Sequence, residues 1–167
     1  MNKLNCLYWE MVEHDAGDAW MIQHFTKVYQ YAKIIGQGEN LDEGELETLL
    51  AAALVHDIGI RPAREKYGDS SGKNQEAEGP EVAKKVLEKV GFDHDAVDRV
   101  CYLVGHHHTY DSVDGLDYQI LIEADFLVNL YENNSDLSAR ESAFNKIFKT
   151  DTGKALFQKM YVGSESE

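Results

Sequence analysis

The stretch LLAAALVHDIGI, residues 49–60, ends an apolar run with a histidine and an aspartate side by side. Upstream of this pair, apolar residues recur at spacings of three and four, which is typical of one face of an α-helix. The residues of that face are Leu46, Leu49, Leu50 and Ala53. His56 and Asp57 extend the same face, so the sequence predicts an imidazole and a carboxylate directed towards the interior. We expect this helix to start after Asp42 and to break at residues 58–62.

Two other predicted helices carry an ionisable residue on an apolar face. The helix expected over residues 19–35 carries His24, and the one over residues 116–131, apolar on nearly all sides, contains Asp125. A buried charge is costly unless it is paired or binds a cation. His24 alone could be an ordinary core histidine, but imidazoles and carboxylates together are good ligands for divalent metals. We therefore predict a metal site made of His24, His56, Asp57 and Asp125.

The dipeptide His-Asp occurs twice more, at residues 14–15 and 94–95, where we expect no chemistry. His14 and Asp15 lie in a polar stretch with a glycine and no apolar periodicity. His94 and Asp95 lie in the first turn of a predicted helix, where an acidic residue suits the helix dipole. For both pairs the sequence favours a solvated or capping role.

Three consecutive histidines, His106 to His108, follow the apolar stripe of a helix that begins near Asp93. Successive helical residues point about 100° apart, so all three cannot face one ion. The stripe directs His107 most nearly inwards and His108 next, and we predict these two as further metal ligands. The alternative is one buried, hydrogen-bonded histidine and two surface ones.

Residues 61–74 resemble a loop that is rich in glycine and serine. Arg61, Arg64 and Lys73 give it positive charge in an acidic chain, and such groups could bind a phosphate of the substrate by charge-assisted hydrogen bonds. An ordinary solvated loop is the alternative.

The remaining apolar stripes predict helices beginning at Gly79, Ser138 and Gly153, and no strand pattern is present. The predicted fold class is therefore all-α, a helical bundle of about six to seven helices. We expect a single domain over residues 1–167, with a core at 19–133, C-terminal helices at 138–161 and a frayed tail at 162–167.

The formal net charge of −14 excludes a broad basic surface, so we expect no nucleic acid polymer and no anionic membrane as a partner. The longest apolar run, residues 49–55, is too short to cross a bilayer. Two cysteines without CxxC spacing fit a reduced, cytoplasmic protein. The expected partner is a small phosphorylated substrate, and the chain could be a monomer or a homodimer.

These motifs resemble the HD-domain superfamily of metal-dependent phosphohydrolases. The resemblance rests on His24 in WMIQHFTKV, on the pair in AALVHDIGI and on Asp125 in IEADFLVNL, in that order. It implies a helical fold, a divalent ion (Mn, Fe, Ni, Co, Zn or Mg) and attack on phosphorus by a metal-activated water, with Asp57 in a catalytic role. The HDIG form is similar to a subgroup in which a second ion is bound and this aspartate bridges both.

One departure concerns the second ion. Two-metal members of the superfamily usually carry another histidine shortly before a glycine, but residues 73–80, KNQEAEGP, contain none. Gln75 or Glu76 takes roughly that place, and Glu76 or Glu78 could serve as an oxygen ligand or general base, so we predict Glu76 as catalytic. One metal site is expected and a second is possible. Two other functions stay open: a di-iron HD-type oxygenase, and a non-catalytic module that binds metal or nucleotide.

Overall fold

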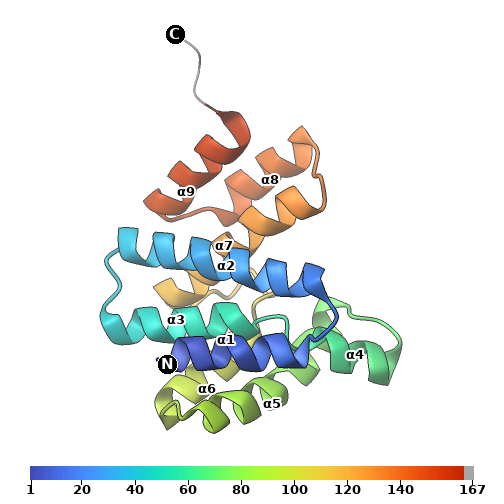
Figure 1. Ribbon diagram of the computed structural model, residues 1–167. Coiled ribbons are helices and arrows are strands. Elements are labelled where there is room, and N and C mark those ends of the chain that lie inside the picture. Colours follow the sequence, from blue (N-terminus) through green and yellow to red (C-terminus); the bar gives the residue numbers. More distant parts are fainter. Residues whose placement is uncertain (164–167) are drawn as a thin grey trace.

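A computed structural model describes residues 1–163, and all the regular structure in that range is helical (Figure 1). The helices are α1 (Lys3–His14), α2 (Ala19–Gly38), α3 (Glu43–Val55), α4 (Ile60–Tyr67), α5 (Gly72–Val90), α6 (His94–Val104), α7 (Leu116–Glu132), α8 (Leu137–Ile147) and α9 (Asp151–Phe157), followed by a π-helical segment, η1 (Gln158–Val162). The all-α prediction is confirmed, and the structure adds α1 and α4 to the helices expected from the sequence.

Aspartate side chains begin four of these helices. Asp18, Asp42, Asp93 and Asp136 each accept a hydrogen bond from a backbone N–H in the first turn of α2, α3, α6 and α8. These N–H groups have no partner within the helix, so each cap stabilises a helix start by about 1 kcal/mol. Asp136, rather than the predicted Ser138, caps α8.

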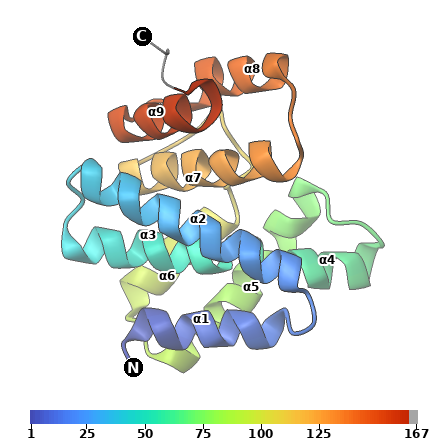
Figure 2. The same ribbon diagram turned by 45° about the horizontal axis from the view of Figure 1, so that its top comes forward.

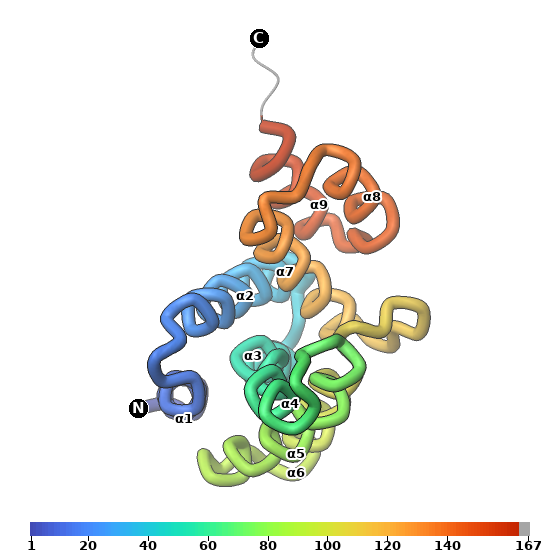
Figure 3. The backbone as a smooth tube through the Cα atoms, turned by 90° about the vertical axis from the view of Figure 1, so that its right-hand side faces the viewer, coloured from blue at the N-terminus to red at the C-terminus, as the bar shows by residue number. Residues whose placement is uncertain are grey.

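Helices α2, α3 and α7 pack against one another and form the centre of the molecule (Figures 1 and 2). Below them in Figure 1 lie α1, α5 and α6, and α8 and α9 cover α7 from the opposite side. The view along the bundle in Figure 3 shows α7 between the C-terminal helices and the lower layer. The central layer therefore brings residues from three distant parts of the sequence together.

The segment after the His-Asp pair differs from the predicted loop. Residues 60–67 form α4, and α5 begins at Gly72, seven residues before the predicted start at Gly79. Pro80 lies inside α5, where it removes one helical hydrogen bond. Since α5 packs on α4, α6 and α1, tertiary contacts override the weak helix propensity of this glycine-rich and polar stretch.

The ends of the chain add two further observations. Leu7 and Met11 of α1 are fully buried, so the N-terminal segment belongs to the core rather than preceding it. The last helical segment ends at Val162, and residues 164–167 of the predicted frayed tail lie outside the described range. Among residues 1–163 no helix is both long and apolar enough to span a membrane.

Candidate metal centre

The end of α3 orients His56. The last carbonyl groups of a helix have no partner within it, and His56 Nδ1 donates a hydrogen bond to one of them, Ala53 O, at 2.9 Å. A carbonyl can only accept, so the proton lies on Nδ1 and Nε2 of the neutral ring carries a lone pair. The ring is fully buried, and Nε2 is directed towards α2 and α7. Its position at the helix end therefore prepares this histidine to bind a cation.

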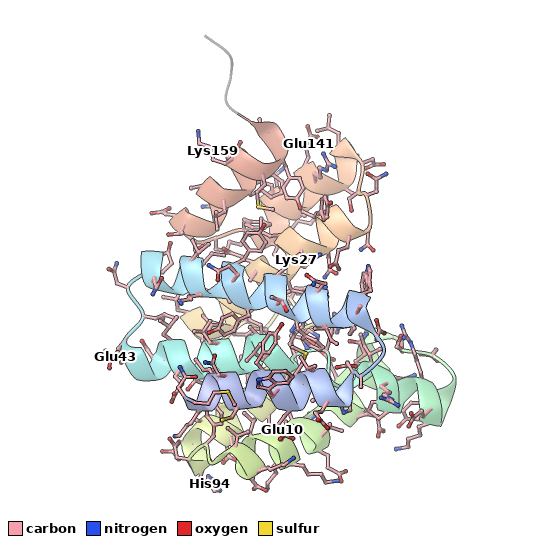
Figure 4. The ribbon with its side chains drawn as sticks, viewed as in Figure 1. Glu10, Lys27, Glu43, His94, Glu141 and Lys159 are labelled. Carbon is pink, nitrogen blue, oxygen red and sulfur yellow. The ribbon has the colours of Figure 1, made fainter. Side chains whose placement is uncertain are left out.

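His24 lies in the second turn of α2, and a side chain, rather than a backbone carbonyl, orients its imidazole ring. Its Nδ1 lies 2.8 Å from Oε2 of Glu132, whose other oxygen pairs with Lys27 at 2.7 Å. Figure 4 shows Lys27 on α2 at the side facing α7. Trp20, one turn earlier, stacks on the imidazole at a centroid distance of 5.8 Å. A carboxylate on one ring nitrogen fixes the ring and leaves the other nitrogen available for a metal.

Four side chains converge at one point between α2, α3 and α7. His24 Nε2 lies 3.1 Å from His56 Nε2, and Asp125 Oδ1 lies 3.2 Å from the first of these nitrogens and 3.4 Å from the second. Asp57 Oδ2 is 3.5 Å from His24 Nε2 and 3.6 Å from His56 Nε2. We call these four residues the first group. Lone pairs that face one another repel, so this arrangement requires a proton or a cation at its centre.

Asp125 tests whether the first group fits a metal. Glu123 on the same helix is also buried, but its carboxylate accepts hydrogen bonds from Gln119, Lys149 and Thr150. By contrast, Asp125 is 3 % exposed, and the groups nearest its Oδ1 are the Nε2 atoms of His24 and His56, at 3.2 and 3.4 Å and without good hydrogen-bond geometry. Buried polar atoms without a partner are rare and call for an explanation. A divalent cation bound by two imidazoles and two carboxylates would explain this buried oxygen.

Electrostatics agree with this fit. Burial raises the pKa of Asp57, but the adjacent His56, His107 and His108 lower it well below its usual range. Burial lowers the pKa of His24, but the carboxylates of Asp125, Asp57 and Glu132 together raise it to about 9. Without a metal, the site therefore keeps its negative charge and holds a compensating proton on His24 at neutral pH.

A second group lies on the other side of Asp57 and consists of Asp57, Gln75, His107 and His108. Asp57 Oδ1 lies 3.0 Å from His107 Nε2 and 3.8 Å from His108 Nε2. His107 Nδ1 donates to Val104 O at 2.9 Å, at the end of α6, so this ring repeats the arrangement of His56. Each oxygen of Asp57 thus faces a different group of ligands. His24, His56 and Asp57 on one side, and Asp57, His107 and His108 on the other, bring ligand atoms close enough together to hold a metal ion.

Gln75 stands where the expected histidine is missing. Its Nε2 donates to Ser70 O at 2.7 Å, which directs Oε1 towards His108 Nε2 at 3.0 Å. Gly59 makes this placement possible, because a Cβ there would meet Gln75 O and would lie 2.8 Å from Gly79 N. The glycine of HDIG therefore lets the turn after α3 approach the α5 backbone closely. A glutamine oxygen is a weaker ligand than an imidazole for a borderline metal.

Glu76 and Lys73, both predicted site residues, lie outside both groups. The Glu76 carboxylate accepts hydrogen bonds from His108 N and from the Thr109 hydroxyl, so it holds the histidine turn and does not face the centre. Lys73 is exposed on α5. His106, which we had placed outwards, is exposed and stacks on Tyr102.

The three His-Asp pairs also differ in space. His94 lies at the outer edge of the molecule (Figure 4), with 84 % of its side chain exposed, as expected for its capping position. Of the two roles expected for Asp15, the solvated one is wrong, because this residue is only 8 % exposed, whereas Asp15 does end α1 as its C-cap residue. The packing of α1 buries it, and the predicted polar stretch gave no sign of α1.

Tyr110 is a residue of the site region that the sequence did not reveal. Burial raises the pKa of its hydroxyl, and the charges of Asp125, Asp57 and Glu76 raise it further. The hydroxyl therefore keeps its proton and is available as a hydrogen-bond donor; the residue is 42 % exposed and its ring packs on Phe126 of α7. Its position in an irregular segment after α6 gives no periodicity by which it could have been found.

The family model described as HD domain matches residues 21–141, which include all residues of both groups. The chain belongs to the HD domain family. A solved structure of a predicted HD superfamily hydrolase from an uncultured Thermotogales bacterium is similar over 96 % of this chain and 83 % of that one, at 28 % identity and a TM-score of 0.64. No curated protein matches the chain. The four predicted ligands, His24, His56, Asp57 and Asp125, all lie within the matched range.

Proposed function

We propose that this HD domain hydrolyses a phosphoester bond in a small molecule, such as a nucleotide. The observation that carries this proposal is the shared carboxylate of Asp57, with one oxygen directed at each of two groups of nitrogen and oxygen ligands. The hydrolase name of the similar Thermotogales protein points in the same direction. The reaction adds the oxygen of water to phosphorus and breaks the bond from phosphorus to the alcohol oxygen, which leaves as the free alcohol.

His24, His56, Asp57 and Asp125 would hold the first divalent ion, and Asp57, Gln75, His107 and His108 a second one. A bound metal ion would lower the pKa of a water molecule and offer positive charge to the phosphoryl oxygens. The protein contributes rigid ligands, because Ala53 O, Val104 O and Glu132 each fix one imidazole ring. Ligands fixed in this way cost little reorganisation during the reaction.

Side chains around the two groups complete the role of the protein. Tyr110 keeps its proton and can donate a hydrogen bond to a phosphoryl oxygen close to Asp125 and Asp57. Arg61 and Arg64 of α4 line one cavity together, so they are better placed for an anionic substrate than Lys73. Guanidinium groups bind phosphate oxygens with two parallel hydrogen bonds, which orients as well as attracts the substrate.

The test is a panel of phosphoesters assayed with Mn, Co, Ni, Fe, Zn or Mg added to the full chain. We expect turnover of at least one phosphoester with at least one metal and none after treatment with a chelator. The Asp57→Ala variant serves as the control for contaminating phosphatases and should show no turnover. Activity that survives both the chelator and this substitution would contradict the proposal.

A di-iron oxygenase is the second candidate, because two histidine-containing groups sharing one carboxylate also suit a pair of iron ions. Measurement of oxygen uptake distinguishes the oxygenase from the phosphohydrolase. Consumption of oxygen by the iron-loaded protein, together with no turnover on the phosphoester panel, would favour the oxygenase. A non-catalytic module is favoured instead if neither reaction occurs and nucleotides bind tightly.

A further inference from the structure

A cavity of about 370 Å³ lies between the α1–α2 turn and α4. Met21 and Ile60 form part of its wall, and each lies three residues from a residue of the first group, His24 and Asp57 respectively. The cavity is therefore lined by the same two segments that position these ligands. A substrate with its phosphoryl group at the centre could extend into this space.

Asp15 lines this cavity with a carboxylate that lacks any hydrogen bond. The residue is 8 % exposed, Oδ2 is buried without a partner, and no side-chain bond to Asp15 is found within residues 1–163. Burial raises the pKa of this carboxyl, and Asp18 and Asp57 add to the effect against His14 and Arg61. A buried acceptor without a donor is costly, and such groups persist where a ligand satisfies them.

Two arginines of α4 line the same cavity and offer donors. Arg61 Nη1 donates to His14 O at 2.7 Å, and Arg64 Nε donates to the Ser70 hydroxyl at 3.2 Å. For the part of the chain that is described, Arg61 Nη2 and both Nη atoms of Arg64 make no hydrogen bond to protein. The cavity therefore presents N–H donors together with carboxylate residues, which are Asp15, Asp18 and Glu65, the last paired with Arg61 Nε at 3.4 Å.

The donors and acceptors of this cavity together indicate which class of ligand it could bind. Arg61 lines the same cavity but donates to His14 O and not to Asp15, so the carboxylate lacks a hydrogen-bond donor. Neutral hydroxyl groups supply such donors, whereas the arginines suit phosphoryl oxygens. A compound with both features is a phosphorylated sugar or polyol.

We propose that this cavity is a substrate subsite in which Asp15 accepts hydrogen bonds from hydroxyl groups of a sugar or polyol phosphate, while Arg61 and Arg64 face its phosphoryl group. The inference rests on the proposed phosphohydrolase function and adds to it a preference for hydroxylated leaving groups. It gives a function to the His-Asp pair that the sequence had favoured as solvated.

Two phosphonates test the subsite without hydrolysis, because their phosphorus–carbon bond is not a phosphoester. Butylphosphonate and 3,4-dihydroxybutylphosphonate have the same charge and chain length and differ in the two hydroxyls. Isothermal titration of the metal-loaded protein should give about tenfold or tighter binding of the dihydroxy compound, since hydrogen bonds to a charged group are strong. In Asp15→Asn the two compounds should bind equally.

Glu13→Gln is the matched control, because it removes the same charge two residues away from an exposed position on α1 that does not line the cavity. It should keep the preference of the wild type. Circular dichroism and melting temperature check the fold of Asp15→Asn, which should melt no lower than the wild type because a buried charge is removed. Asp15→Ser provides a second variant with the same expected loss of preference.

Three results would overturn the subsite: equal binding of both phosphonates by the wild type, a preference that persists in both Asp15 variants, or no binding of either compound. Failure of the proposed function looks different, since it appears as absent turnover on the phosphoester panel. The ratio of the two phosphonate affinities depends on Asp15 alone and stays informative in either case.

Discussion

The first and second groups share Asp57 but differ in burial and in charge. In the first group the side chains of His24, His56 and Asp125 are at most 5 % exposed, and two carboxylates balance the cation. In the second group His108 is 25 % exposed and Gln75 contributes a neutral amide oxygen in place of an imidazole. Buried anionic ligands bind a cation tightly, whereas exposed and neutral ones release it more easily. We therefore predict that the first group retains its ion and that any ion in the second group exchanges.

Removal of the shared carboxylate should have the largest effect, because it damages both groups. We expect Asp57→Ala to lose bound metal and to lower phosphoester turnover by more than about 10³-fold, since charge stabilisation is lost together with the ion. Elemental analysis and steady-state kinetics measure the two effects. His106→Ala is the control from the same histidine run, because His106 lies outside both groups, and it should behave like the wild type.

Substitutions on either side of Asp57 should then separate the two groups. His24→Ala should abolish the retained ion, whereas His107→Ala should leave it and remove only the second equivalent. The measurement is the metal-to-protein ratio after gel filtration, for protein loaded with an excess of Mn or Co. Equal loss of metal in both variants would show that the groups act as one site and would break the comparison.

The sequence anticipated the central helices because their apolar stripes are long and regular. It also directed His24, His56, Asp57 and Asp125 inwards, and in the structure each carboxylate has an oxygen within 3.6 Å of both imidazole Nε2 atoms. Helical periodicity is enough to predict the direction of these side chains, because a helix turned to another face would bury charged groups without partners. Their role as metal ligands stays a prediction.

Other parts of the site depend on tertiary contacts that no local pattern encodes. Asp15 is buried by the packing of α1, and Glu76 is turned towards the backbone of the histidine turn. Residues 60–74 have weak helix propensity, yet they form α4 and the start of α5 because neighbouring helices hold them. Tyr110 lies in an irregular segment, where spacing carries no information about direction.

The acidity dependence of metal binding gives a third, smaller effect. Neighbouring carboxylates raise the pKa of the His24 imidazole to about 9. Below that pH, a cation that binds this ring must therefore displace a proton from it. Affinity of the first group should therefore rise with pH, by roughly 100-fold between pH 7 and pH 9 for one displaced proton. Competition with a metallochromic chelator at pH 7, 8 and 9 measures it. An affinity that does not change over this range would contradict the assignment of His24.

The smallest expected effect comes from restoring the missing histidine. Gln75→His should raise the affinity of the second group by about tenfold while leaving the first group unchanged, because imidazole is the better ligand for borderline metals. Titration of the protein that already holds its retained ion isolates this second step. Gln75→Leu is the matched control and should weaken the same step. Unchanged affinity in both variants would place the second ion away from Gln75.

The most direct test of the account is the metal content of the wild-type chain purified without any chelator. Inductively coupled plasma mass spectrometry should find about one equivalent of a divalent transition metal per chain that survives gel filtration, and a second equivalent only with metal in excess. Absence of bound metal, together with no change in melting temperature on adding Mn, Fe, Co, Ni or Zn, would contradict the central claim that His24, His56, Asp57 and Asp125 form a metal centre.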